Sequence, residues 1–182
     1  MIEVEPGHQY KFRVIAVNRV GDSAYSPFSD IIMAASEPGR IDQPWYVAST
    51  SFSMSLAFDK VSDDGGSPVS YYNLYVDKDT GSGYELITSY NGKSLEWTVD
   101  QADESDLVTG NVYKFKVSAV NVIGEGELSN HVTIALSSRV STPTTPTVNR
   151  ALSSLTSLHI EWSEGTPGDI PVDGYQLWMI DM

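Results

Sequence analysis

The sequence predicts an all-β protein built as an antiparallel sandwich or barrel. Along Tyr113–Ala119 apolar and polar residues alternate, which is the two-residue period of a strand with one buried face. Segments of this kind are separated by turn-forming residues such as Asp63–Pro68 and Thr80–Gly83. Short strands at regular spacing are typical of sandwiches and barrels. No segment of the sequence shows a convincing helical period.

One structural unit occurs more than once in the chain. Tyr113–Gly126 repeats the pattern of Tyr10–Asp22, and Pro171–Tyr175 repeats that of Pro68–Tyr72. Both spacings are 103 residues, from 10 to 113 and from 68 to 171. Two different parts of the unit therefore recur with one period, which is typical of a repeat protein.

The strands of the unit follow in order from their inward residues. Met54, Leu56 and Phe58 define the second strand, and Tyr72, Leu74 and Val76 define the third. The fourth and fifth strands are predicted at residues 84–90 and 95–99, and the sixth at 113–119. The corresponding inward residues elsewhere in the chain are Tyr10, Phe12, Val14 and Ala16, then Leu158, Ile160 and Trp162, then Tyr175, Leu177 and Met179.

With these strands in place, the chain resembles tandem fibronectin type III domains. The resemblance is carried by an aromatic residue on the second strand (Phe58, Trp162), by a tyrosine on the third (Tyr72, Tyr175), and by Leu107–Tyr113 before the sixth. It implies immunoglobulin-like β-sandwich modules in tandem, in which Leu107–Tyr113 forms a tyrosine corner.

The resemblance also implies how the chain divides into domains. Residues 1–36 match the C-terminal part of a domain, with its last two strands, residues 37–140 match a complete domain, and residues 141–182 match the first three to four strands of a further one. The family places the fourth and fifth strands in different sheets. Asn91-Gly92, which locally resembles a two-residue hairpin, is therefore expected to be a corner between sheets.

The end of the unit is marked by a second short element. Asn18–Gly21 and Asn121–Gly124 share the pattern Asn-x-x-Gly, and they are followed by Ser29 and Ser129 before the last strand. This equivalence makes the first copy about three residues longer than the second.

Composition excludes several classes of function. The chain has no cysteine, so disulfides, thiolate metal sites and cysteine nucleophiles are ruled out. Its net charge of −13 argues against nucleic acid as a partner, because phosphate binding needs clustered lysine and arginine. No apolar run approaches the roughly 20 residues of a membrane helix. His8, His131 and His159 are scattered, and no serine has a placed base, so we expect no enzyme and no cofactor.

The acidic loops raise the question of calcium. The sandwich topology places Asp77 and Asp79 with Asp103, Glu104 and Asp106 at the pole that faces the next unit, which carries Asp169 and Asp173. Carboxylates gathered at a junction are suitable Ca²⁺ ligands. We expect solvated acidic loops here, with a junction calcium site as the alternative.

Outward aromatic side chains are the candidates for contacts with partners. Tyr71 and Tyr75 share the outer face of the third strand, and Trp178 takes the position equivalent to Tyr75. Such residues anchor protein or sugar partners. The structural alternative is that Lys114 and Lys116 cover the tyrosines by cation–π contact.

The sequence therefore predicts a non-enzymatic structural or adhesion scaffold, a segment of an extended array that spaces or displays protein contacts. The partners would be other proteins or neighbouring copies of the chain. One alternative is a head-to-tail fibre in which the terminal partial domains complete one another, because neither part can close a sandwich alone. Another is a receptor- or carbohydrate-binding ectodomain. The expected location is extracellular or at the cell surface, with an intracellular cytoskeletal or ciliary array as the alternative.

Overall fold

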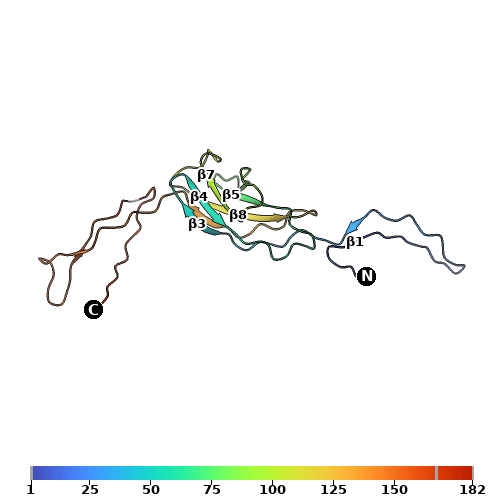
Figure 1. The fold of residues 1–182 in the computed structure, drawn as a ribbon, viewed down its shortest axis with the longest axis horizontal. Helices are drawn as coiled ribbons and strands as arrows, with labels where there is room; N and C mark the ends of the chain where they lie inside the picture. Colours follow the sequence, from blue (N-terminus) through green and yellow to red (C-terminus); the bar gives the residue numbers. More distant parts are fainter. Residues whose placement is uncertain (1, 167, 182) are drawn as a thin grey trace.

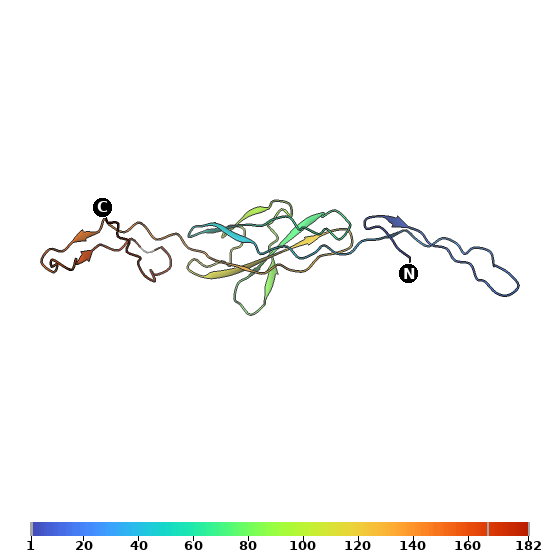
Figure 2. The ribbon, with the colours of Figure 1, turned by 90° about the horizontal axis from the view of Figure 1, so that it is seen from below.

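The protein is elongated, with a β-sandwich in the middle and an extended arm on each side. The computed structural model describes residues 2–166 and 168–181. We call residues 37–140 the middle unit, residues 2–36 the N-terminal arm, and the described residues from 141 onward the C-terminal arm. The two arms leave the middle unit at opposite ends (Figure 1, Figure 2). None of the described residues forms a helix, so none offers a helix able to cross a membrane.

The middle unit consists of two antiparallel sheets. The three-stranded sheet has the order β3-β4-β7 and comprises β3 (Trp45–Ser49), β4 (Ser53–Ala57) and β7 (Glu96–Asp100). The four-stranded sheet has the order β6-β5-β8-β9 and comprises β5 (Tyr71–Asp77), β6 (Tyr84–Leu86), β8 (Val112–Val120) and β9 (Val132–Ala135). The predicted sandwich is confirmed, and β6 and β7 lie at sheet edges.

The alternation read from the sequence decides which side chains form the core. Tyr72, Leu74 and Val76 of β5 are buried, and the residues between them are not. Met54 and Leu56 of β4 face them from the other sheet as part of one apolar cluster. Burial of apolar area of this kind is the main driving force for the fold. The aromatic pair expected from the resemblance is present, since Phe58 and Tyr72 make an edge-to-face contact at 5.3 Å between ring centroids.

Asn91-Gly92 forms a corner between the two sheets. The preceding strand β6 pairs with β5, whereas the following strand β7 pairs with β4. Gly92 has a φ of 73°, a left-handed conformation that glycine adopts without strain. The fourth strand ends at Leu86, earlier than the predicted residue 90. The Ile87 side chain is buried instead, and the Ile87 N–H still donates to the carbonyl of Leu74.

The tyrosine corner occurs twice at the repeat spacing. In the middle unit the Val108 N–H donates to the Tyr113 hydroxyl at 2.7 Å, and in the N-terminal arm the Glu5 N–H donates to the Tyr10 hydroxyl at 2.8 Å. The Asn-x-x-Gly turns recur in the same way. The Asn121 Oδ1 accepts from the N–H groups of Ile123 and Gly124, and the Asn18 Oδ1 accepts from those of Val20 and Gly21.

The N-terminal arm is a long hairpin whose two sides are tied by serines. At its base β1 (Gln9–Tyr10) pairs with β2 (Ile32–Met33). Beyond that pair the hydroxyls of Ser29, Ser26 and Ser23 accept from the N–H groups of Phe12, Val14 and Ala16 respectively. In the middle unit Ser129 accepts from Val117 in the same way. Ser26 therefore occupies the place of Ser129, and the predicted equivalence of Ser29 with Ser129 was wrong.

The C-terminal arm repeats the start of the unit. Its β10 (Thr147–Val148) pairs antiparallel with β11 (Ile160–Glu161). Trp162 and Tyr175 make an edge-to-face contact at 5.7 Å between ring centroids, as Phe58 and Tyr72 do in the middle unit.

The arms differ from the middle unit in what covers their apolar side chains. Phe115 and Val117 are fully buried, whereas their counterparts Phe12 and Val14 are 36% and 70% exposed. In the C-terminal arm Leu177 and Met179 are exposed as well. Among the described residues the arms thus have the local geometry of the unit without an opposing sheet.

Side chains also tie the first segment of the middle unit to its last. The Gln43 Nε2 donates to the carbonyl of His131 at 2.9 Å, and the Ser49 hydroxyl donates to the carbonyl of Ser137 at 2.9 Å. Arg40 donates to the side chain of Asn130. These contacts connect the two segments of the unit that lead into the arms.

Candidate functional site

The outer face of β5 holds the first candidate contact residues. Tyr71 is 45% exposed, but Tyr75 is only partly accessible, because its hydroxyl donates to the Glu125 Oε1 at 2.6 Å. Burial, followed by the hydrogen bond and charge of Glu125, raises the pKa of Tyr75 to about 12. Burial also acts to raise the pKa of Glu125, but hydrogen bonds from Asn73, Ser118 and Tyr75 outweigh it and hold that pKa below its ordinary value. The hydroxyl of Tyr75 is thus held by a hydrogen bond within the middle unit.

A lysine does cover an aromatic ring on this face, but the ring differs from the one expected. Lys116 lies opposite Tyr75 in the register of β5 with β8. Its ammonium group stands over the ring of Tyr84, 4.6 Å from the centroid. Tyr84 sits on the edge strand β6, where its ring reaches across the neighbouring β5 to the lysine of β8.

Trp178 lies far along the chain from the two tyrosines and in a different setting. It is 84% exposed on the C-terminal arm. With Leu158, Ile160, Leu177 and Met179 it lines an open apolar groove of about 740 Å³. Tyr71 lines a separate hollow on the middle unit. The three candidate aromatics therefore do not form one patch.

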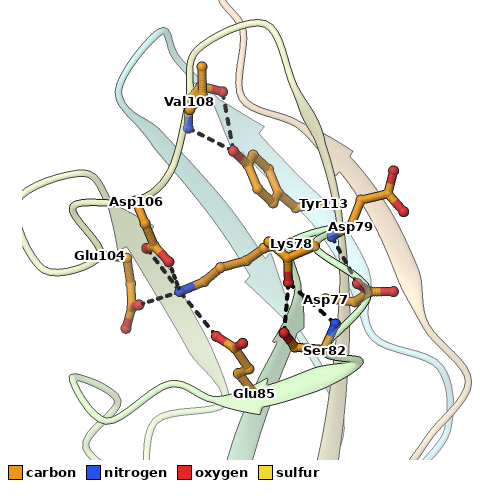
Figure 3. Close-up of polar contacts among 10 residues, drawn as sticks. Asp77, Lys78, Asp79, Ser82, Glu85, Glu104, Asp106, Val108 and Tyr113 are labelled. Carbon is orange, nitrogen blue, oxygen red and sulfur yellow. Dashed lines mark hydrogen bonds and ion pairs between the residues drawn. The ribbon is translucent and has the colours of Figure 1, made fainter.

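Lys78 binds two acids of the predicted pole, Glu104 and Asp106, and a third carboxylate, Glu85. Its side chain is only 8% exposed, and its ammonium lies 2.7 Å from Asp106, 3.1 Å from Glu104 and 3.6 Å from Glu85 (Figure 3). Burial acts to lower the pKa of Lys78, but the hydrogen bonds to Asp106 and Glu104 outweigh it and raise that pKa. The same contact lowers the pKa of Asp106. A protein cation thus pairs with two of the candidate calcium ligands, Glu104 and Asp106.

The remaining acids of this pole are used in local turns or lie apart. The Asp77 carboxylate accepts from the Asp79 N–H at 2.9 Å (Figure 3), and Asp79 has a φ of 56°. The N–H of Asp103 donates to the Asp100 carboxylate. Across residues 2–166 and 168–181, no three carboxylate or histidine groups come together in a way that could hold a metal ion. The structure does not bring the candidate calcium ligands into one site.

Asp169 ties the C-terminal arm to the middle unit. Its Oδ2 accepts from the Ser138 N–H at 2.8 Å, from the Ser138 hydroxyl at 3.1 Å and from the Ser51 hydroxyl at 2.8 Å. The hydrogen bond from the Ser138 backbone leads the effects that lower the pKa of Asp169. Asp173, the other predicted acid of this arm, is exposed and makes no hydrogen bond within the described part of the chain. One carboxylate of the C-terminal arm thus binds two residues of the middle unit, Ser51 and Ser138.

Hydrogen bonds also hold the first junction, between the N-terminal arm and the middle unit. The Ser36 N–H donates to the carbonyl of Gly65, and the Asn121 Nδ2 donates to the carbonyls of Ser36 and Asp64. A Cβ at Gly65 would lie 2.3 Å from the Ser36 carbonyl oxygen, so only glycine allows this approach. Gly168 occupies the equivalent place at the second junction, where a Cβ would lie 2.1 Å from the carbonyl oxygen of Ser138.

Lys78, Asn121 and Ser138 organise these contacts and are not among the site residues predicted from the sequence. Lys78 stands between Asp77 and Asp79, two of the predicted ligands, so its charge is the signal available in the sequence. The sequence predicts Asn121 as part of a turn. Its side-chain amide also donates hydrogen bonds to Ser36, 85 residues earlier, and to Asp64, 57 residues earlier. Ser138 carried no sequence signal.

The middle unit matches a known family. The sequence profile described as "Fibronectin type III domain" matches residues 42–135, just over half of the chain. The chain belongs to the fibronectin type III family. One fibronectin type III domain is matched, and it lies within the middle unit. The fold predicted from the resemblance is confirmed by this match and by the two sheets.

Relatives of known identity share this domain type. Myomesin-2 of Homo sapiens is 34% identical over 127 residues, which cover 68% of this chain and 8% of Myomesin-2. Fibronectin type-III domain-containing protein 3A of Pongo abelii is 26% identical over 184 residues, which cover 95% of this chain and 15% of that protein. The chain thus spans only a small part of the length of these curated relatives.

The fold is shared with solved structures. Domains A168–A170 of titin align with a TM-score of 0.50 at 20% sequence identity, covering 73% of this chain and 42% of that one. At this level of identity the likeness concerns the fold.

Proposed function

We propose that the chain is a structural scaffold, a segment of an array of fibronectin type III modules that spaces protein contacts. The observation that supports this most is the recurrence of one set of hydrogen bonds at a spacing of 103 residues. The tyrosine corners at Tyr10 and Tyr113 and the turns at Asn18 and Asn121 belong to it. A recurring unit whose neighbours touch mainly each other is the building principle of repeat proteins.

In this proposal residues 1–36, 37–140 and 141–182 belong to three successive modules. The contacts at the two junctions support it. Gly65 and Gly168 stand at equivalent places, and each brings a loop against the backbone that leads into or out of the middle unit. The carboxylate of Asp169 adds three hydrogen bonds to the second junction. Such contacts would fix the angle between modules, which is what a spacer requires.

The relatives support the same role. They include Myomesin-2, a titin homolog and the M-protein of striated muscle. The family is generally non-enzymatic, and we propose no catalytic activity for this chain. The striated-muscle relative favours the cytoskeletal location over the cell surface, and protein partners or neighbouring copies remain the proposed contacts.

The alternative of a receptor- or carbohydrate-binding ectodomain has less support. It requires one patch that contains all three aromatic residues. The Tyr75 hydroxyl, however, is hydrogen-bonded to Glu125, and Trp178 and Tyr71 line different hollows of the molecule. We therefore prefer the scaffold.

The proposal is tested by measuring whether the second junction holds a fixed angle. The chain has no cysteine, so Lys93→Cys on the middle unit and Leu155→Cys on the C-terminal arm accept one spin label each. Pulsed electron paramagnetic resonance on dilute protein gives the distribution of distances between the two labels. A spacer gives a narrow distribution that Asp169→Ala broadens.

Asp173→Ala is the matched control, because Asp173 lies four residues away and makes no hydrogen bond within the described residues. It should leave the distribution unchanged. A distribution that is already broad in the parent protein would contradict the spacer proposal.

A further inference from the structure

The corner between the two sheets of the middle unit contains an exposed asparagine followed by glycine. Asn91-Gly92 is the only Asn-Gly pair in the sequence. Asn91 is exposed, and the glycine after it has a φ of 73°. Asparagine is among the thermolabile residues of proteins, because its side-chain amide reacts with the backbone nitrogen of the next residue. The corner therefore places a reactive pair of groups on the surface of the folded unit.

The side-chain carbonyl of Asn91 is held by two backbone donors. Its Oδ1 accepts from the N–H groups of Lys93 and Ser94, each at 2.9 Å. Its Nδ2 donates to the Ser94 hydroxyl at 2.7 Å. When a nucleophile attacks such a carbonyl, negative charge develops on the oxygen, and donors that already point at that oxygen stabilise the charge. The two N–H groups thus polarise the amide of Asn91 toward attack at Cγ.

The backbone nitrogen of Gly92 is the nucleophile next to this amide. Its N–H donates no hydrogen bond among the described residues, whereas the Gly92 carbonyl accepts from the Tyr72 N–H at 2.8 Å. Glycine also has no side chain that would obstruct ring closure. The nitrogen is thus available for attack, while the carbonyl of the same residue is anchored to β5.

Two other turns show what the glycine adds. Asn18 and Asn121 hold their side chains as Asn91 does, since the Oδ1 of each accepts from the N–H groups two and three residues later. They are followed by Arg19 and Val122, whose side chains hinder the approach of the backbone nitrogen. Asn121 is also buried, and its Nδ2 is held by two carbonyls. The three turns share one pattern of donors, and glycine follows the asparagine in one of them.

We propose that Asn91 is a site of spontaneous deamidation in the folded protein. The Gly92 nitrogen gives its proton to a base of the solvent and attacks Cγ of Asn91. The new C–N bond closes a succinimide ring, the bond from Cγ to Nδ2 breaks, and ammonia leaves with a proton from the solvent. Water then opens the ring. Attack at the side-chain carbonyl gives aspartate, attack at the backbone carbonyl gives isoaspartate, and the net change is amide plus water to acid plus ammonia.

The two products change the corner in different ways. Aspartate keeps the path of the backbone and adds a negative charge where the amide donated to Ser94. Isoaspartate carries the backbone through the side chain, which adds a methylene before Gly92. Space there is tight, because even a Cβ on Gly92 would lie 3.3 Å from the Tyr71 Cβ. The isoaspartate product should therefore lose the bond from the Tyr72 N–H to the Gly92 carbonyl.

Peptide mapping of the aged protein tests the site. The folded chain is incubated at physiological temperature and weakly alkaline pH and is then digested with trypsin. Residues 79–93 form one tryptic peptide, in which Asn91 is the only side-chain amide. Mass spectrometry measures conversion to the acid, and an isoaspartate-specific methyltransferase measures the isomer. We expect both products at Asn91 and no conversion at Asn18 or Asn121.

The same chain unfolded in guanidinium chloride is the control for the fold, because it reports how fast a flexible Asn-Gly pair converts. The folded chain should convert at a comparable or higher rate. Conversion should also accelerate as the pH rises from weakly acidic to weakly alkaline, because the attacking nitrogen must lose its proton. An amide that persists in the folded chain while the unfolded chain converts overturns the proposal. Aspartate without isoaspartate does so as well, since direct hydrolysis of the amide gives aspartate alone.

Arg19→Gly is the matched variant, because it puts glycine after the exposed Asn18 and leaves both donors of that side chain in place. Conversion at Asn18 should rise from none to a rate similar to that at Asn91. If Asn18 stays an amide in this variant, the two donors and the glycine are not sufficient, and the proposed cause is wrong.

Asn91→Asp supplies the aspartate product directly. Its thermal unfolding should match that of the parent, whereas aged protein rich in isoaspartate should unfold at a lower temperature. An unchanged unfolding temperature of the isoaspartate form would contradict the expected loss of the Tyr72–Gly92 bond. The inference concerns the middle unit alone and goes beyond the scaffold, so the spin-label experiment and the peptide map can fail independently.

Discussion

The N-terminal arm and the middle unit have the same local hydrogen bonds but very different burial. Both contain the tyrosine corner, the Asn-x-x-Gly turn and a serine that accepts from the strand before it. Phe12 and Val14 are nevertheless exposed where Phe115 and Val117 are buried. Hydrogen bonds between residues less than about twenty positions apart follow from the sequence of one segment, whereas burial of its apolar side chains requires the opposing sheet. A segment thus determines its own turns and local hydrogen bonds, and the complete sandwich adds the core.

The largest difference is expected at the buried phenylalanine. Phe115→Ala removes a fully buried ring and should lower the free energy of unfolding of the middle unit by about 3–5 kcal/mol, since it loses apolar burial and leaves a cavity. Phe12→Ala, at the equivalent exposed position, should change it by less than about 0.5 kcal/mol. Urea unfolding followed by tryptophan fluorescence measures both. Equal effects would mean that the arm is buried in solution.

The second test separates the local and tertiary bonds of one residue type. Asn121→Ala removes two local bonds and also the bonds to the carbonyls of Ser36 and Asp64, so we expect a loss of about 2 kcal/mol. Asn18→Ala removes only the local pair. Its effect on the same unfolding transition should be too small to measure. If Asn121→Ala also leaves the free energy of unfolding unchanged, the contacts at the first junction do not contribute to stability.

The third test concerns the tyrosine corner. Tyr113→Phe deletes the hydroxyl that bonds to Val108 and should cost about 1–2 kcal/mol, because the partner groups lie in a partly buried loop. Tyr10→Phe deletes an exposed copy of the same bond and should not move the transition of the middle unit. Thermal unfolding by circular dichroism is sufficient. If Tyr10→Phe lowered the melting temperature of the middle unit more than Tyr113→Phe does, the prediction would be wrong.

The smallest effect is expected at the ion cluster around Lys78 in the middle unit. Lys78→Met should lower the free energy of unfolding by about 1 kcal/mol at neutral pH, because Asp106 is more than half exposed and solvent weakens the pair. The pKa of Asp106 is lowered on folding, so its contribution is present above the unfolded value of about 3.9 and is lost as the pH falls. The pKa of Lys78 is raised, so its contribution is present at neutral pH and is lost only in strong alkali.

The difference between Lys78→Met and the parent should therefore be constant from weakly acidic to weakly alkaline pH and should shrink below about pH 4. Lys93→Met is the control, because Lys93 is exposed and forms no ion pair among the described residues. A difference that stays constant down to strong acid would show that Lys78 acts through packing alone.

The second to sixth strands of the middle unit could be predicted because each repeats an apolar residue at every second position. Tyr72, Leu74 and Val76 illustrate this, and all three are buried. The corner at Asn91-Gly92 needed the family resemblance, because local signals favoured a hairpin. The early end of β6 was missed because the apolar pattern continues to Ile87 while the pairing with β5 stops at Leu86.

The contacts at the junctions and the ion cluster were harder to predict. Lys78 meets Glu104 and Asp106, which are 26 and 28 residues away, and Asp169 meets Ser51 at a distance of 118 residues. Such pairs depend on how loops approach one another in the folded protein. The periodic pattern of apolar residues along the sequence contains no information about this. The partner of Lys116 could not be predicted either, since its choice of Tyr84 over Tyr75 depends on the position of the edge strand β6. The calcium site and the contact aromatics stay predictions.

The ties between the first and last segments of the middle unit have a consequence for a chain under tension. A pull applied through the two arms would act on opposite ends of the sandwich, where the arms leave it (Figure 1). The bonds from Gln43 to His131 and from Ser49 to Ser137 join segments that run in the same direction, so the pull would slide one segment past the other. All of these bonds would then resist together, and the module would yield at a higher force than a hairpin opened from one end.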